Sequence, residues 1–307
     1  MNWHGVMPAL TTPFDKNLQV DHAFLASHSQ WMIEEGCTGI VALGSLGEAP
    51  TLAFDEKIEI LKTLVKASNG ATPVVAAISS LSTAEAVKLA KAAEDAGCSG
   101  LMVLPPYVYR SDWRETSFHV SSIFSATKLS CMLYNNPVAY GTDFLPEQIR
   151  ELADGHENLQ AVKESSTDVR RVTALRALDA PSGEERLKIF VGVDDAIVEG
   201  IAAGAVGWIA GLVNAMPQES IALFNHARAG RSKEAFELYR WFLPLLRLDT
   251  VPKFIQLIKF VQEEVGQGSS RVRPPRLEIV GEDLAATRKL VQDALKSRPS
   301  STVLAGA

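Results

Sequence analysis

The sequence is poor in cysteine, with only three residues, Cys37, Cys98 and Cys131. An odd number of cysteines in separate segments, without a CxxC spacing, argues against a disulfide framework and against a zinc site. The six histidines are also scattered without the spacing of metal ligands. We therefore predict that the protein uses no metal and no cofactor.

Long apolar runs and an excess of positive charge are absent as well. No apolar run reaches the roughly 18 residues of a membrane span, and residues 1–4 lack the charged and apolar regions that begin a secretory signal peptide. The formal net charge is −6, which disfavours nucleic acid and anionic membranes as partners because both bind basic surfaces. We expect a soluble, cytoplasmic protein whose partner is a small molecule.

Short apolar runs alternate with helical patterns along the first two thirds of the chain. The runs lack a polar face, which is typical of parallel strands covered by helices on both sides. The predicted strands occupy residues 6–10, 39–43, 73–78, 100–104, 131–134, 159–162, 187–191 and 205–210. The predicted helices between them occupy residues 21–35, 51–67, 82–97, 113–126, 146–154, 169–178 and 196–203.

This alternation predicts an α/β fold, a (β/α)8 TIM barrel, with a C-terminal helical appendage. Gly36, Gly97 and Gly204 each end a predicted helix, and each is followed three residues later by a second glycine. The helix–strand units therefore repeat. A doubly wound open sheet is the alternative, but no GxGxxG follows the first strand. We expect a barrel over residues 1–215, a helical region over 216–296 and a flexible tail over 297–307.

Three polar side chains follow or end predicted strands at the barrel end where active sites lie. They are Ser45, Tyr134 and Lys163. A lysine among apolar walls loses the solvation of its ammonium form, so its pKa falls, and the neutral amine can form a Schiff base with a carbonyl. Tyr134 could then move protons, with Ser45 relaying them between Tyr134 and water.

Each of these residues also has an ordinary structural explanation. Lys163 could be solvated, Tyr134 could be a buried aromatic residue, and Ser45 could be a turn residue. We expect Glu48 to be structural, accepting hydrogen bonds from loop N–H groups. Because all three residues are expected at one end of the barrel, a catalytic role is favoured over an ordinary structural role for each.

The motifs around these residues resemble those of the dihydrodipicolinate synthase and N-acetylneuraminate lyase superfamily, whose members are class I, Schiff-base-forming enzymes. The resemblance covers residues 5–296. It implies Lys163 as the Schiff-base lysine, Tyr134 as the acid and base, Ser45 as a relay, and a substrate carboxylate held by the backbone of Ser45 and Leu46. It also implies a homotetramer built as a dimer of dimers. The motifs are Gly44–Glu48, Tyr134–Pro137, Val162–Ser165, Gly192–Asp194, and the region of Asn214 and Pro217.

Three departures from the family pattern bear on the substrate. The synthases carry an arginine after the tyrosine motif for a second carboxylate, whereas residues 138–141 contain no cation. Leu46 replaces a second hydroxyl residue, and the paired tyrosines after Pro106 become Tyr107-Val108-Tyr109, which puts a tyrosine shared across subunits in doubt. The side chains and glycines expected to contact substrate are Leu46, Gly47, Tyr107, Tyr109, Asn136, Tyr140, Gly192 and Ile209.

These departures argue against lysine biosynthesis. Residues 134–141, with residues 44–48 and 104–106, most resemble the branch that deaminates 1-pyrroline-4-hydroxy-2-carboxylate in hydroxyproline catabolism, giving 2,5-dioxopentanoate and ammonia. The expected partner is thus a small keto or cyclic imino acid. The alternatives are a 2-keto-3-deoxy sugar acid aldolase or dehydratase, a dihydrodipicolinate synthase, and a non-catalytic ligand-binding barrel.

Overall fold

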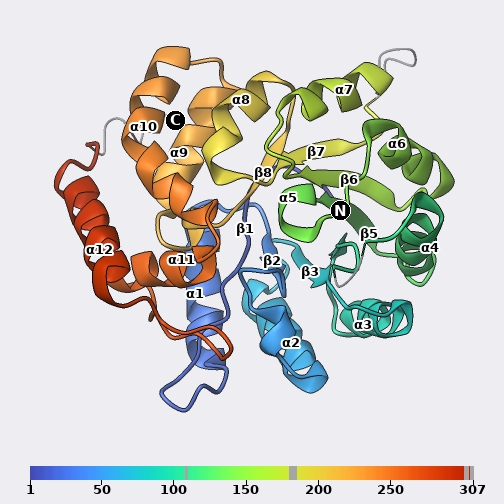
Figure 1. The fold of residues 1–307 in the computed structure, drawn as a ribbon, viewed down its shortest axis with the longest axis horizontal. Helices are drawn as coiled ribbons and strands as arrows, with labels where there is room; N and C mark the ends of the chain where they lie inside the picture. The colour runs from blue at the N-terminus through green and yellow to red at the C-terminus, as the bar shows by residue number, and fades with distance from the viewer. Residues whose placement is uncertain (108–109, 180–184, 301–303, 305–307) are drawn as a thin grey trace.

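Eight parallel strands form a nearly closed barrel in the computed structural model, which describes residues 1–107, 110–179, 185–300 and 304 (Figure 1). The hydrogen-bonded order is β1-β8-β7-β6-β5-β4-β3-β2, and a parallel bridge between Ala9 and Val41 links the first strand to the second. The predicted (β/α)8 barrel is therefore confirmed. The strands are β1 (Gly5–Pro8), β2 (Ile40–Ala42), β3 (Val74–Ile78), β4 (Gly100–Val103), β5 (Ser130–Asn135), β6 (Leu159–Glu164), β7 (Lys188–Val191) and β8 (Gly207–Ala210).

Helices surround the barrel and begin at recognisable caps. The side chains of Asp21, Ser82 and Asp112 each accept a hydrogen bond from the backbone N–H three residues ahead, which satisfies a donor that has no partner within the helix. The helices of the barrel region are α1 (His22–Glu34), α2 (Phe54–Ser68), α3 (Thr83–Asp95), α4 (Trp113–Phe124), α5 (Pro137–Tyr140), α6 (Pro146–Gly155), α7 (Arg170–Asp179) and α8 (Ile197–Ala202). None of the helices in the described ranges is long and apolar enough to cross a membrane.

The structure corrects two local details of the sequence analysis. The helix predicted over residues 51–67 is present as α2, but it starts only at Phe54, and a short 3-10 helix, η1 (Ala49–Thr51), precedes it. The carboxylate of Glu56 accepts the backbone N–H of Ala53 and fixes the helix start there. The segment Pro137–Tyr140, which lies outside the predicted helices, forms the helical turn α5, because Asn136 caps it by accepting the N–H of Ala139 at 3.0 Å.

The strands β5 and β6 run further than the sequence predicts. Their ladder continues because the N–H of Ser165 donates to the carbonyl of Asn135 at 2.8 Å, and the N–H of Gly192 to that of Glu164 at 2.9 Å. Tyr134 and Lys163 are consequently paired residues inside the sheet rather than its last residues. This pairing fixes their side chains more firmly than a loop would.

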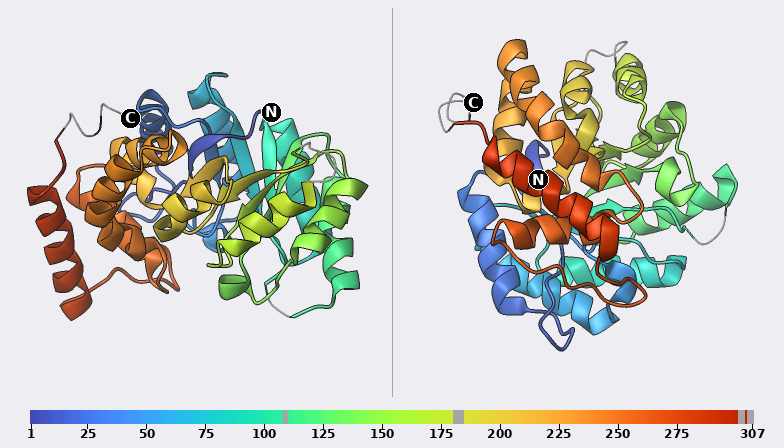
Figure 2. Two further views of the ribbon diagram at one scale, coloured as in Figure 1. Left: turned by 90° about the horizontal axis from the view of Figure 1, so that it is seen from above. Right: turned by 60° about the vertical axis from the view of Figure 1, so that its left-hand side comes forward.

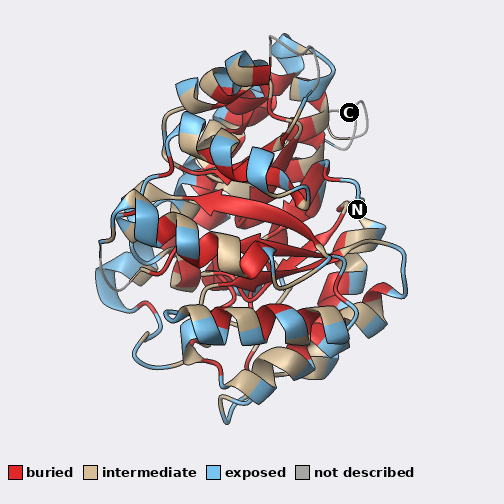
Figure 3. Ribbon diagram, turned by 90° about the vertical axis from the view of Figure 1, so that its right-hand side faces the viewer, coloured by how far each residue is buried: buried red, intermediate tan, exposed pale blue. Residues whose placement is uncertain are grey.

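The strands are buried nearly throughout, as the colours of Figure 3 show. Met7, Phe190 and Trp208 are among the large side chains in the core. Gly207 leaves room for the ring of Phe190, since a methyl group at this glycine would overlap the ring. The strands are apolar on both faces because one face packs in the barrel interior and the other packs against the helices.

The C-terminal helices lie together on one side of the barrel, with α12 outermost (Figure 2). Their buried residues Leu238 and Phe242 belong to the same hydrophobic cluster as Trp208 of the barrel, so a shared core holds the two regions together. The boundaries at residues 215 and 296 stay predictions. The elements are α9 (Pro217–Arg228), α10 (Ser232–Leu246), α11 (Phe254–Glu264) and α12 (Gly281–Lys296), with short 3-10 helices η2 (Asp194–Ala196), η3 (Leu212–Asn214) and η4 (Arg247–Asp249).

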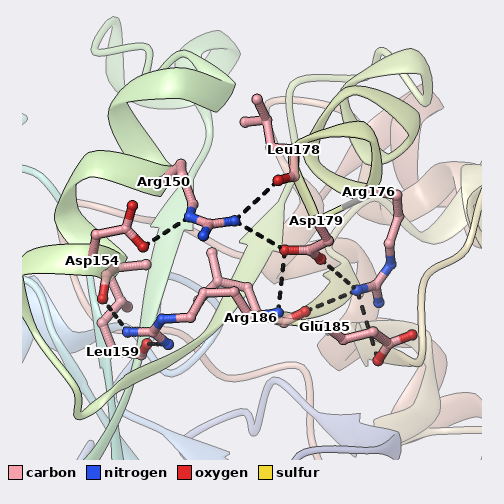
Figure 4. A network of polar contacts seen from close by, with 10 residues as sticks. Arg150, Asp154, Leu159, Arg176, Leu178, Asp179, Glu185 and Arg186 are labelled. Atoms are coloured by element: carbon pink, nitrogen blue, oxygen red, sulfur yellow. Dashed lines mark hydrogen bonds and ion pairs between the residues drawn. The ribbon is translucent and has the colours of Figure 1, made fainter. Parts of the chain in front are cut away.

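A polar network joins α6, α7 and the entry to β7 (Figure 4). The carboxylate of Asp179 accepts from Arg150 at 3.3 Å, from Arg176 at 3.4 Å and from the backbone N–H of Arg186 at 3.2 Å. The guanidinium of Arg186 also donates to the carbonyl of Leu159 at 2.9 Å. These charge-assisted bonds fix the start of β6, the strand that carries Lys163.

Candidate active site

A pocket of about 540 Å³ opens at the carboxyl ends of the barrel strands, a size typical of small-molecule sites. Residues from the strand ends line it, and the segment 249–255 and Arg276 from the C-terminal region add one wall. The predicted site residues that line it are Ser45, Leu46, Tyr107, Tyr134, Asn136, Tyr140, Lys163, Gly192 and Ile209. Tyr109 lies outside the described residues.

Lys163 projects into this pocket from β6 and faces Tyr134 of the neighbouring strand. The two residues are paired in register, and the lysine Nζ lies 4.2 Å from the centre of the tyrosine ring. Lys163 is only 5% exposed. Burial lowers its pKa, while Tyr140, Asp249 and Asp194 act in the opposite direction. The geometry favours a neutral amine, which is the form that attacks a carbonyl or imine carbon.

Gly192 makes room for the lysine. A methyl group at Gly192 would overlap Cε of Lys163 and Oγ of Ser165, and would lie 2.7 Å from Cγ of Lys163. No larger residue fits here without moving the lysine. Gly192 lines the pocket, where contact with substrate stays a prediction, and it sets the path of the lysine side chain.

Tyr140 lies between the other two hydroxyl residues. Its hydroxyl shares a short hydrogen bond with Ser45, and its ring meets that of Tyr134 edge-on at 5.7 Å between centroids. Burial raises the pKa of Tyr134, and hydrogen bonding with Asn136, Ser165 and Tyr140 acts in the opposite direction. A direct relay from Ser45 to Tyr134 was expected, but the order in the structure is Ser45, Tyr140, Tyr134.

The turn α5 is what brings Tyr140 to this position. Asn136 caps the turn through Oδ1, and its Nδ2 donates to the hydroxyl of Tyr134 at 3.1 Å. Asn136 therefore helps to position both Tyr134 and Tyr140. Tyr107 adds a third phenol, 5.9 Å from Tyr140 between ring centroids, so the pocket contains three aromatic hydroxyl groups.

The loop after β2 offers backbone donors to the pocket. Leu43 and Glu48 at its two ends have positive φ angles of 64° and 54°, a costly conformation that is often found at functional sites. Within the described chain, no residue accepts a hydrogen bond from the N–H of Ser45 or Leu46. Both residues line the pocket.

Two loop residues support this arrangement without lining the pocket. Gly47 packs against the carbonyl of Leu10, from which a methyl group would be only 3.0 Å away, so its expected contact with substrate is not seen. Glu48 is fully buried and binds Nζ of Lys259 at 2.6 Å and the N–H of Arg273 at 3.1 Å. Glu48 thus ties the loop to the C-terminal region instead of to N–H groups of its own loop.

Sequence reasoning missed two charged residues of the pocket wall, Asp249 and Arg276. The only sequence signal for a functional residue here was Asp249, the one charged residue in the stretch 248–252. Within the described ranges, no three His, Cys, Asp or Glu side chains gather in a way that could hold a metal ion.

Comparisons with known proteins agree with this geometry. The model of the dihydrodipicolinate synthetase family matches residues 2–294. A 4-hydroxy-tetrahydrodipicolinate synthase of Mesorhizobium japonicum is 32% identical over 282 residues, which covers 92% of this chain and 94% of that protein. The corresponding synthase of Methanocaldococcus jannaschii is 29% identical, with 95% and 97% covered.

A solved structure gives the same result for the fold. The crystal structure of a putative dihydrodipicolinate synthetase from Pseudomonas aeruginosa is 28% identical, has a TM-score of 0.89, and matches over 95% of this chain and 100% of that one. These matches span nearly the whole chain, including the strands that carry the pocket residues. The chain therefore belongs to the dihydrodipicolinate synthetase family and is a class I aldolase-like lyase.

Proposed function

We propose that this enzyme deaminates 1-pyrroline-4-hydroxy-2-carboxylate to 2,5-dioxopentanoate and ammonia. The main support is the tyrosine segment above Lys163. Where the resemblance leads one to expect an arginine for a second carboxylate, this segment carries Val138, Ala139 and the phenol of Tyr140. A substrate with a single carboxylate and a hydroxyl group matches such a pocket better than a dicarboxylic product does.

The substrate carboxylate would bind the free N–H groups of Ser45 and Leu46. This places C2, the carbon next to the carboxylate, near the amine of Lys163. The neutral amine attacks C2 of the cyclic imine, and the bond from C2 to the ring nitrogen then breaks. The nitrogen leaves as a primary amine on C5, with a proton delivered through Tyr134, and Lys163 holds C2 as a Schiff base.

The Schiff base then acidifies the hydrogens on C3. Removal of one C3 proton, with Tyr134 and the hydroxyls of Tyr140 and Ser45 as the path to water, leads to loss of the C4 hydroxyl as water. Isomerisation converts the C5 amine to an imine. Hydrolysis at C5 releases ammonia and hydrolysis at C2 frees Lys163. One water is lost and two are consumed, so the net reaction takes up one water.

A second candidate is the condensation for which the two relatives described above, both 4-hydroxy-tetrahydrodipicolinate synthases, are named. One observation favours it. Arg276 lines the pocket from the loop before α12, and a guanidinium there can pair with a second carboxylate. The pocket thus contains a cation, although not in the tyrosine segment.

Parallel assays on one preparation separate the two candidates. Ammonia release from the hydroxylated imine is measured alongside condensation of pyruvate with aspartate 4-semialdehyde, each with Lys163→Ala as the control. Ammonia release that is lost in Lys163→Ala supports the deaminase. Condensation without ammonia release overturns the deaminase in favour of the synthase, and no turnover of either substrate overturns both.

We also propose a homotetramer. The support is a surface hollow lined by Leu81 and Phe118, which are 49% and 68% exposed. Apolar side chains that gather on a surface are typical of contact between subunits. Light scattering after size-exclusion chromatography tests this, and a monomer at micromolar concentration would contradict it.

A further inference from the structure

A carboxyl group from the C-terminal region reaches into the pocket of Lys163. Asp249 is the last residue of η4, directly after α10, and it lines the pocket. The carboxyl rests on Gly211, just past β8, where a methyl group would overlap Oδ1 and lie 2.7 Å from Oδ2. The absence of a side chain at Gly211 therefore seats this carboxyl at the barrel mouth.

The carboxyl of Asp249 lacks the partners that a structural carboxylate has. Its Oδ1 is shielded from solvent and, within the described chain, has no hydrogen-bond partner. Asp194 nearby differs, because it accepts from the N–H groups of Gly211 and Leu212 and from the indole of Trp208. Buried polar groups are normally paired, so the free oxygen of Asp249 points to a missing ligand.

Burial of the Asp249 carboxyl favours its protonated form. Burial is the main cause that raises its pKa well above the usual value, and the carboxylates of Asp194 and Asp195 add to this, while Lys163 opposes it. No ion pair within 4.0 Å joins Lys163 to a carboxylate in the described chain. The amine of Lys163 and the carboxyl of Asp249 thus line the same pocket without forming an ion pair.

We propose that Asp249 is a catalytic residue that donates its proton to the leaving hydroxyl group of the substrate. This rests on the proposed function, in which C2 is bound to Lys163 and C4 loses its oxygen. As the C3 proton leaves, its electron pair forms the C3–C4 double bond and the C4–O bond breaks. The oxygen departs with the proton of Asp249 as water, and the carboxylate regains a proton from solvent.

The test uses Asp249→Asn, which keeps the shape of the side chain but has no acidic proton. Ammonia release from the imine is compared with trapping of pyruvate on Lys163 by borohydride, since pyruvate has no hydroxyl to lose. We expect ammonia release to fall by roughly 100-fold or more, with pyruvate trapping close to wild type. Asp95→Asn, which changes an exposed carboxylate that does not line the pocket, should retain ammonia release.

Trapping with the imine itself gives the sharper result. Borohydride added during turnover should yield, in Asp249→Asn, a Lys163 adduct that still carries the C4 oxygen and is one water heavier than the dehydrated adduct. Wild-type ammonia release by Asp249→Asn would overturn this proposal and leave the deaminase assignment standing. Equal loss of pyruvate trapping would also overturn it, since Asp249 would then only shape the site. A wild-type enzyme that releases no ammonia refutes the deaminase assignment itself.

Discussion

Substitution of Gly192 by alanine tests whether the path of the Lys163 side chain matters for activity. The added methyl group would lie 2.7 Å from Cγ of Lys163 and would overlap Cε, whereas ordinary carbon contacts are about 3.5–4.0 Å. The side chain must therefore move by roughly 1 Å, a misplacement that costs on the order of 100-fold in rate. Overpacking should also lower the free energy of unfolding by about 1–3 kcal/mol.

The assay is the rate at which borohydride traps pyruvate on the enzyme, read from intact mass and accompanied by a thermal unfolding curve. Gly155→Ala is the matched control, because no atom lies within 4 Å of the position that its methyl group would take. We expect Gly155→Ala to trap pyruvate like wild type. A folded Gly192→Ala enzyme with wild-type trapping would refute the inference that this glycine positions the amine.

Three further predictions concern the hydroxyl chain, a buried ion pair and a buried histidine. Tyr140→Phe removes the hydroxyl bonded to Ser45 and should lower kcat by about 10²–10⁴-fold with little change in KM; an unchanged kcat in steady-state assays would contradict the relay. Glu48→Gln removes the negative charge that lies 2.6 Å from the buried ammonium of Lys259 and should cost about 3–5 kcal/mol in urea unfolding at pH 7; a loss near zero would show that the pair is dispensable. Burial lowers the pKa of His28 to about 4, below its unfolded value of about 6.5, so the unfolded state binds more protons between these limits and stability should fall by up to roughly 3 kcal/mol as pH drops from 6.5 to 4. His28→Gln should flatten that part of the stability curve, and an unchanged curve would contradict the reasoning.

The barrel and the central pair of the site could be predicted from the sequence because both depend on local patterns. Short apolar runs between helices indicate buried parallel strands, and residues at the ends of such strands meet at one edge of the barrel. Lys163 and Tyr134 follow from that rule alone. Their register, side by side on β6 and β5, confirms the expected proximity.

The remaining site residues depend on turns and long-range packing. Tyr140 reaches Ser45 because Asn136 and Pro137 start a helical turn, which the apolar pattern of four residues does not reveal. Asp249 reaches the pocket because η4, which follows α10, places its carboxyl against Gly211. No spacing in the sequence links residues that are so far apart in the chain.

The central claim is that Lys163 is a buried amine that forms a Schiff base. Its most direct test is reduction of the enzyme with borohydride in the presence of pyruvate, followed by peptide mapping. The account predicts one adduct per chain, located on Lys163, and none in Lys163→Ala. An adduct on a different lysine, or none in the folded wild-type enzyme, would contradict it.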